Sequence, residues 1–208
     1  AVGRQANAAK ANAIALGNEA KSLGEDAVAV GNNANAAQNR AMAFGKNSQA
    51  SAGDAIAMGD STVASGQNAL AFGKNNKAEG KDAIAIGTNN NAWKVDSIAF
   101  GHSANADGEQ AVAIGLNSHA RQANAVALGQ GANADDTNAL AIGTSSIAAQ
   151  AAAIAIGNNA RALKYSSIVI GEGAHSNNSR SVVIGYNASA INPADSASNQ
   201  DTNQTVAI

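Results

Sequence analysis

The sequence predicts an all-β fold, a parallel β-solenoid whose coils are each fourteen residues long. A glycine recurs every fourteen residues without one insertion or deletion, at residues 3, 17, 31, 45, 59, 73, 87, 101, 115, 129, 143, 157, 171 and 185. The four residues before each glycine alternate between small and bulky, as in Ala83-Ile84-Ala85-Ile86. Hydrophobic residues make up 45% of the chain but aromatic residues only 3%, so few large side chains are available to fill a conventional core. A strict period of this length indicates a repeat architecture.

The spacing within each repeat predicts strands and argues against a helix. The bulky residues are two apart, which is the period of a β-strand, whereas a coiled-coil seam needs steps of three and four. A glycine inside a helix would also be destabilising by roughly 1 kcal/mol. A second small pair follows three and five residues after the glycine, as in Ala34 and Ala36. Each repeat is therefore predicted to form two short strands, separated by a glycine turn and by a polar turn.

The turn residues account for the other fixed features of the repeat. We expect the repeated glycine to adopt a backbone conformation that a Cβ would forbid. The glycines singled out for this role are Gly31, Gly59, Gly87, Gly115, Gly143 and Gly171. Asn or Asp often stands five residues before the glycine and suits the polar turn. Examples are Asp26, Asp54, Asp82, Asp96, Asn124 and Asn138.

A fourteen-residue coil encloses a narrow tube, in which we expect only Ala, Ser and Thr to fit. The bulky pair must then point outward, which places 26 large apolar side chains on one face over the thirteen repeats that end at Gly17 to Gly185. Leaving them in water would forgo on the order of 40–80 kcal/mol of gross burial free energy. We therefore expect identical chains to pack on this face, and the spacing alone leaves open a face-to-face dimer or a three-fold prism. The residues expected at the centre of the assembly are Ile56, Met58, Ile84, Ile86, Ile98, Phe100, Ile154 and Ile156.

Composition excludes several classes of protein. The net charge of −2 provides no basic surplus for nucleic-acid binding. No apolar run approaches the roughly 20 residues that span a bilayer, and there is no Cys. No cluster of acid, base and nucleophile stands out, so an enzyme is not expected. We also expect no cofactor and no metal site, because His102, His119 and His175 fall in polar positions of different coils. The chain starts at Ala1 without an initiator Met or signal peptide, and we expect it to be part of a longer protein.

The repeat is predicted to extend over residues 1–191. After Gly185 the next small-bulky set is Thr205-Val206-Ala207-Ile208, so about ten residues are inserted. We predict a polar protruding loop over residues 192–204 and the start of a further, truncated repeat over residues 205–208.

Exposed aromatic residues beside cations are the best candidates for surface binding. Trp93, Lys94 and Val95 form one candidate, and Leu163, Lys164 and Tyr165 hold the same repeat positions five coils later. The alternative for Trp93 is packing over loops of a neighbouring subunit. Tyr186 and the loop that follows it form another candidate, for which the alternative is a connector without a binding role.

Three repeats carry a resemblance to a known family. Ser97-Ile98-Ala99-Phe100-Gly101, Ser167-Ile168-Val169-Ile170-Gly171 and Ser181-Val182-Val183-Ile184-Gly185 resemble the YadA-like head repeat of trimeric autotransporter adhesins. The resemblance recurs in every coil from residue 1 to about 191. It implies a single-stranded left-handed parallel β-roll and three chains about one axis. It also implies display on the surface of a Gram-negative bacterium, with the outer-membrane anchor in a C-terminal domain outside this sequence.

The resemblance also implies a function. Members of the family bind extracellular-matrix proteins such as collagen, fibronectin or laminin, other cells, or abiotic surfaces. We therefore expect a multivalent adhesin head. The alternative is a structural spacer, for which fourteen coils would provide roughly 65 Å of reach.

Overall fold

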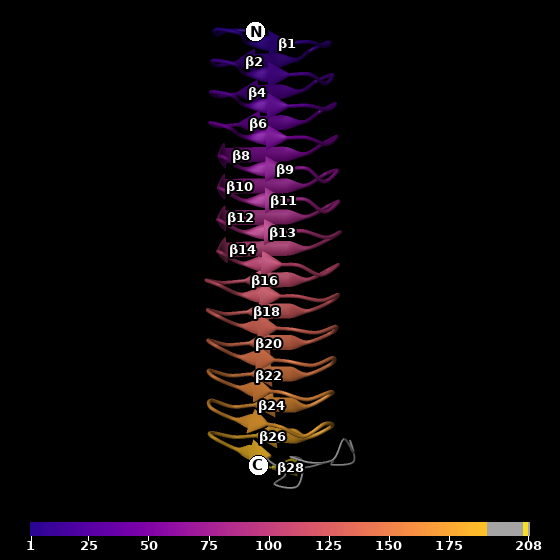
Figure 1. Ribbon diagram of the computed structural model, residues 1–208, viewed down its shortest axis with the longest axis vertical. Helices are drawn as coiled ribbons and strands as arrows, with labels where there is room; N and C mark the ends of the chain where they lie inside the picture. Colours follow the sequence, from indigo (N-terminus) through magenta and orange to yellow (C-terminus); the bar gives the residue numbers. More distant parts are fainter. Residues whose placement is uncertain (191–205, 208) are drawn as a thin grey trace. The chain divides into compact units, whose positions relative to one another are not determined.

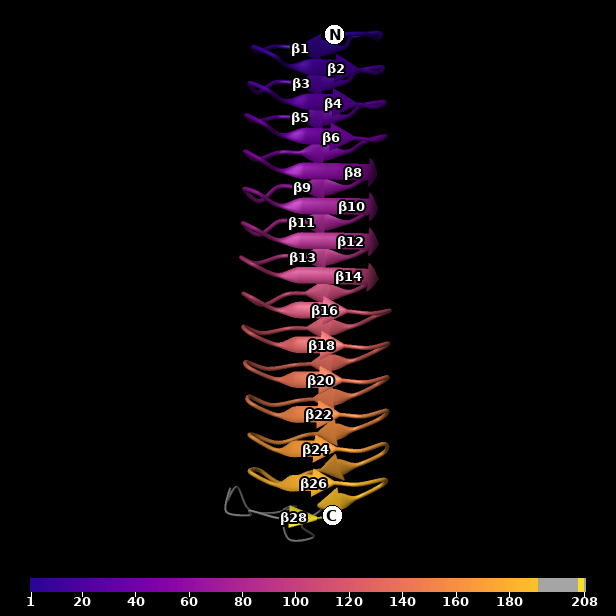
Figure 2. The ribbon, with the colours of Figure 1, turned by 180° about the vertical axis from the view of Figure 1, so that it is seen from behind.

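The computed structural model describes residues 1–190 and 206–207, and within this range the secondary structure consists of strands and turns. The chain divides into two compact units, Ala1–Ala104 and Asn105–Ile208. In each unit the coils stack in sequence order, with turns at both lateral edges (Figure 1). The view from behind shows the same stacking (Figure 2). Each coil contributes one strand to each of two parallel sheets.

In the first unit, longer strands end one residue before or one residue after the repeated glycine, and two-residue strands follow it. The longer strands are β2 (Ile14–Leu16), β4 (Val28–Val30), β6 (Met42–Phe44), β8 (Ile56–Asp60), β10 (Leu70–Lys74), β12 (Ile84–Thr88) and β14 (Ile98–His102). The short strands are β1 (Asn7–Ala8), β3 (Lys21–Ser22), β5 (Asn35–Ala36), β7 (Gln49–Ala50), β9 (Val63–Ala64), β11 (Lys77–Ala78) and β13 (Asn91–Ala92).

The second unit has the same two kinds of strand. The strands before the glycine are β16 (Val112–Ile114), β18 (Val126–Leu128), β20 (Leu140–Ile142), β22 (Ile154–Ile156), β24 (Ile168–Ile170) and β26 (Val182–Ile184). The short strands are β15 (Asn105–Ala106), β17 (His119–Ala120), β19 (Asn133–Ala134), β21 (Ile147–Ala148), β23 (Arg161–Ala162), β25 (His175–Ser176) and β27 (Ser189–Ala190). β28 (Val206–Ala207) pairs in parallel with β26, while the loop predicted over 192–204 lies outside the described residues.

Within each unit, every strand pairs with the strand one coil away in the same register. Ile84 is opposite Ile98 and Ala85 is opposite Ala99, fourteen residues apart, and all pairs are parallel. Each position of the sequence repeat is therefore a physical column that runs along its unit. The predicted parallel β-solenoid of fourteen-residue coils is confirmed.

The direction of the side chains follows the predicted division into small and bulky positions. The interior is lined by alanines that are completely buried, such as Ala83, Ala85 and Ala92. None of the 26 bulky residues that precede Gly17 to Gly185 is buried; Phe100, for example, is 51% exposed. A single chain thus has a core of small residues and carries its large apolar side chains outside.

The expectation that only Ala, Ser and Thr fit inside the coil is wrong at four positions. Asn76, Asn90, Val169 and Val183 are all completely buried. The two valines are register partners in adjacent coils, so each packs on the other along the stack. The two asparagines are accommodated because the backbone satisfies their amide groups.

The buried asparagines form a ladder of hydrogen bonds next to the glycine turn. Asn76 Nδ2 donates to the carbonyl oxygens of Phe72 (2.7 Å) and Gly87 (2.6 Å), and its Oδ1 accepts from the Asn90 N–H (2.9 Å). Asn90 repeats the pattern one coil further, with three distances of 2.8 Å. The strands before the glycine lengthen to five residues in this region, as in β10 and β12. A buried polar side chain is tolerated here because its donors and acceptor are all used.

The repeated glycine has both a special backbone conformation and no room for a side chain. Gly115 has φ +131°, and a Cβ added to it would lie 2.6 Å from the carbonyl oxygen of Gly129 in the next coil. A second backbone feature is not visible in the fourteen-residue pattern. A residue with φ between +50° and +65° recurs every seven residues from Gln5 to Asn187, and 25 of these residues are not glycine. Each coil is therefore built from two half-coils of seven residues, both closed by a left-handed residue.

Ala152 is the left-handed residue that suits its position least. It has φ +56°, whereas most other positions of the series hold Asn, Asp, Ser or Gly. Asn tolerates the left-handed region far better than Ala. Ala152→Asn is therefore expected to stabilise the fold by about 1 kcal/mol, measured as a higher denaturation midpoint. Ala151→Asn is the matched control, because Ala151 lacks a positive φ; an equal gain from both variants would contradict this explanation.

Candidate functional site

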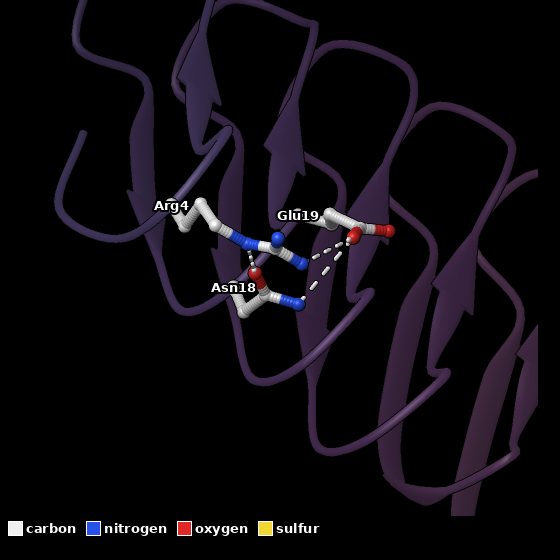
Figure 3. A network of polar contacts seen from close by, with 3 residues as sticks. All are labelled: Arg4, Asn18 and Glu19. Atoms are coloured by element: carbon white, nitrogen blue, oxygen red, sulfur yellow. Dashed lines mark hydrogen bonds and ion pairs between the residues drawn. The ribbon is translucent and has the colours of Figure 1, made fainter.

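Outward side chains in the turns interact with the equivalent positions of the next coil. Arg4 Nε donates to Asn18 Oδ1 (3.0 Å), and Arg4 Nη2 lies 3.4 Å from Glu19 Oε1 (Figure 3). Both charged side chains of this ion pair are largely exposed, so its contribution to stability is small. The turn columns are therefore accessible surface on which residue identity can vary without disturbing the coil.

Trp93 lies in the polar turn directly after β13. The residue is 37% exposed, and the ammonium group of Lys77 lies 5.5 Å from the ring centroid, within cation–π range. Lys94 and Val95 follow it and are exposed. Lys77 belongs to β11, one coil earlier, and its contact with Trp93 was not anticipated from the sequence.

The residues Leu163, Lys164 and Tyr165 form the corresponding turn after β23. Leu163 is half-buried, Lys164 is exposed, and Tyr165 is 48% exposed. The backbone N–H of Arg180 donates to the carbonyl oxygen of Tyr165 (3.0 Å), so Arg180 lies in the next coil beside this turn. The two candidate triplets lie in different units, and each is a separate patch.

Tyr186 follows Gly185 and is 76% exposed. It lies in a glycine turn, whereas the Tyr165 triplet lies in a polar turn; these turns occupy opposite edges of a coil (Figure 1). Tyr186 and Tyr165 therefore do not share a binding surface. The loop that was predicted to accompany Tyr186 lies outside the described residues.

A charged cluster in the second unit was missed because its members come from three coils. Arg121 forms an ion pair with Asp135, and its Nη2 donates to His119 Nδ1 at 3.0 Å. Burial lowers the pKa of His119, and Arg121 lowers it further. Burial raises the pKa of Asp107, against the opposing effect of His119 and Arg121. The cluster holds neutral His119 as an acceptor for the guanidinium.

This arrangement predicts a loss of stability on mild acidification. Because the folded-state pKa of His119 is below its ordinary value of 6.5, the unfolded chain takes up the proton first as the pH falls through 6.5. The midpoint of urea denaturation is therefore expected to decrease between pH 7.5 and pH 6, and the decrease should be smaller in His119→Gln. His102→Gln is the control, since His102 is exposed. An unchanged pH dependence in His119→Gln would contradict the role assigned to this histidine.

The largest candidate surface is the bulky face, which the bulky residues before the repeated glycines form on the outside of each unit. Among the residues expected at the centre of an assembly, Met58 and Phe100 are exposed and the other six are half-buried. They lie in the same sheet of their unit and point away from the alanine core. Apolar surface of this extent is typical of a protein–protein interface.

The described residues contain no group of three or more His, Cys, Asp or Glu side chains placed to hold a metal ion. Within the same range, no helix is long and apolar enough to cross a membrane. The exposed turn columns, the aromatic side chains in the turns and the bulky face are surfaces suited to binding.

Comparison with known proteins identifies the family. The YadA head domain repeat model matches residues 1–20, 22–48, 40–62, 50–76, 64–90, 92–118, 120–146, 137–160 and 162–188. No curated protein matches the chain. Among solved structures, the chain is similar to the collagen-binding domain of the Yersinia adhesin YadA, with 22% identity, a TM-score of 0.28, and coverage of 95% of this chain and 94% of that chain. Because the family matches extend over most of the 208 residues, the chain belongs to the YadA head domain repeat family and is a head domain of the adhesin type.

Proposed function

We propose that three copies of this chain pack their bulky faces around a common axis and form the head of a bacterial surface adhesin. The observation that carries the proposal is the set of 26 large apolar side chains on the outer faces of the two units, none of which is buried within one chain. Covering this face contributes roughly 25 cal/mol for each Å² of apolar area removed from water. No described element of the chain covers the face, so a second and a third copy are the simplest cover.

A trimeric head would present each turn column three times and in many successive coils. Weak contacts with a repetitive partner then combine, because each further contact forms within an already bound complex. Extracellular-matrix proteins such as collagen, fibronectin and laminin are repetitive partners of this kind, and cell or abiotic surfaces are others. We propose that the polar-turn columns, including Trp93 and Tyr165, are the surfaces that meet the partner.

Adhesion by the purified protein tests this function. The trimer, coupled to beads, is expected to bind surfaces coated with collagen, fibronectin or laminin above the level of albumin-coated surfaces. Trp93→Ala and Tyr165→Ala are expected to reduce binding, whereas Thr144→Ala, in an exposed glycine turn, is the matched control. Trimeric protein that binds no coated, cellular or plastic surface would contradict the adhesin function.

The second candidate function is a structural spacer that holds another binding domain away from the cell. The uninterrupted coil register within each unit favours it, because a spacer needs regular rise and no specific turn residues. Removal of two whole coils, residues 18–45, distinguishes the two functions. Adhesion that stays intact after these coils are removed would favour the spacer, whereas adhesion that falls with their removal would favour binding by the coils.

A further inference from the structure

We propose that the surface around Arg161, Lys164 and Tyr165 binds an anionic polysaccharide, one whose sugar rings carry sulfate or carboxylate groups. The inference rests on the proposed adhesin function and names the partner of one of its turn surfaces. It follows from the local charge, the exposure of the side chains and their places in adjacent coils.

The charge of this region differs in sign from that of the whole chain. The full sequence has a net charge of −2. Between residues 137 and 190, however, Arg161, Lys164 and Arg180 are the basic residues and Glu172 is the only acidic residue. Glu172 follows Gly171 and lies in a glycine turn, at the edge of the coil opposite the polar turn that holds Lys164. Among the residues that the structure describes, the face around Lys164 therefore has basic groups and no acidic neighbour of its own.

The two main cations are exposed. Arg161 is the outward residue of β23, and Lys164 lies in the turn three residues later. Among ion pairs within residues 1–190, none includes Arg161 or Lys164. The nearest acidic residues before them in the polar-turn columns, Asp135 and Asp136, lie two coils away, roughly 10 Å along the stack. Asp135 already pairs with Arg121, and Asp136 accepts a hydrogen bond from the Thr137 N–H (2.6 Å). Both cations are therefore available to an anionic partner.

The uncharged part of the surface fits a sugar ring. Tyr165 exposes about half of its side chain beside Lys164, and Leu163 is half-buried in the same turn. An aromatic ring offers a flat apolar face together with a hydroxyl group. The Arg161 guanidinium provides a fork that matches a sulfate or carboxylate, and Lys164 provides a point charge.

His175 adds a polar group to the same face. It is the register partner of Arg161 in the next coil, and its Nε2 lies 3.1 Å from Ser189 Oγ. Equivalent positions repeat at about 4.8 Å along the stack, so a chain of sugars lying across the coils can meet several of these side chains at once.

The Trp93 turn does not share these electrostatics. Lys81 pairs with Asp82 at 3.6 Å in the preceding coil, and Asp96 follows Lys94 in the same turn. Glu79 precedes Trp93 by one coil in the same column. Two turns with matching aromatic-cation triplets thus differ in charge, and only the Tyr165 turn is suited to a polyanion.

The surface around Arg161 and Lys164 has too few cations to suit a nucleic-acid partner. Duplex DNA is typically held through about 6–10 phosphate contacts, more than this surface supplies. A polysaccharide needs fewer charged contacts where the aromatic ring also packs on the sugar. DNA is therefore a competitor to be tested and not the proposed ligand.

Retention of the full-length chain on immobilised heparin tests the proposal. The wild type is expected to be retained at low salt and eluted by NaCl, and chemically desulfated heparin should not retain it. The double variant Arg161→Gln/Lys164→Gln is expected to bind heparin about tenfold more weakly or worse. Tyr165→Ala should weaken binding and Tyr165→Phe should preserve most of it.

The matched control is Lys21→Gln/Lys10→Gln. Lys21 and Lys10 are exposed and hold the repeat positions of Arg161 and Lys164, so the charge change is the same at a distant part of the sequence. The control is expected to bind heparin like the wild type. Equal losses in both double variants, or a loss of less than twofold in Arg161→Gln/Lys164→Gln, would overturn the proposal.

Further outcomes distinguish a failure of the polysaccharide proposal from a failure of the adhesin function. If a DNA duplex binds more tightly than heparin and Tyr165→Ala has no effect, the surface is a general polyanion site and the polysaccharide proposal is overturned. If the wild type fails to bind heparin but still adheres to matrix-coated surfaces, this inference fails while the adhesin function stands. Absence of adhesion by a trimer that binds heparin would instead contradict the adhesin function.

Discussion

Replacement of Ala85 by leucine is expected to abolish the native coil around that residue. Ala85 is completely buried, and its register partners Ala71 and Ala99 occupy the same interior column one coil away on each side. Overpacking of an ordinary core typically destabilises by about 1–3 kcal/mol. The effect here should reach or exceed the upper end of this range, because the opposite wall of the coil is formed by another strand that is hydrogen-bonded to its neighbours on both sides.

Thermal unfolding monitored by circular dichroism measures this effect. Ile86→Leu is the matched control, since Ile86 is adjacent to Ala85 but points outward and is only half-buried. The control keeps the side-chain volume and should change stability by less than about 1.5 kcal/mol. Equal melting temperatures for Ala85→Leu and the wild type would show that the interior has room for large residues, contrary to the structure.

Introduction of a charge on the bulky face is expected to dissociate the assembly. Ile84 is one of the bulky residues of this face and lies beside Ile98 in the next strand. In an assembly of three chains, Ile84→Lys would place three ammonium groups in or near the apolar interface. An unpaired buried charge is destabilising by several kcal/mol, so the trimer should lose at least two orders of magnitude in association.

Size-exclusion chromatography with light scattering follows the dissociation. Gln49→Lys is the control, because Gln49 is an exposed outward residue of the other sheet. It introduces the same charge and should leave the assembly intact. A trimer that tolerates Ile84→Lys as well as Gln49→Lys would place the interface elsewhere.

The fold was predictable because the backbone repeats with the sequence. The fourteen-residue register puts each position in one column, so the alternation of Ala83-Ile84-Ala85-Ile86 already separates the interior from the outer face. Parallel pairing between identical positions requires no knowledge of distant contacts. Small residues inside and bulky residues outside then follow from the width of the coil.

The features that were not predicted depend on exceptions within a column. The seven-residue recurrence of left-handed residues is hidden because Arg40, Ala152 and Ser166 stand where Asn or Asp is more usual. The ladder of Asn76 and Asn90 is hidden for a similar reason, since a polar residue at a small position gives no indication that backbone groups satisfy it. Both features depend on hydrogen bonds between coils, which the repeat pattern does not specify.

The charged surfaces were not predicted because their residues are neighbours in adjacent coils and not neighbours along the chain. Asp107, Arg121 and Asp135 come from successive coils, and so do Arg161 and His175. These surfaces can be found by comparing the charges of residues at equivalent positions, fourteen residues apart, including the outward position after each short strand. Such a comparison separates the mixed charge near Trp93 from the basic surface near Tyr165.

The solution mass of the purified chain tests most directly whether its bulky face is covered by other copies. One chain has a mass of 20.4 kDa. Light scattering at micromolar concentration is expected to measure a particle of three chains, about 61 kDa, whose mass does not fall on dilution within this range. A stable, soluble particle of about 20 kDa under the same conditions would contradict the proposed assembly.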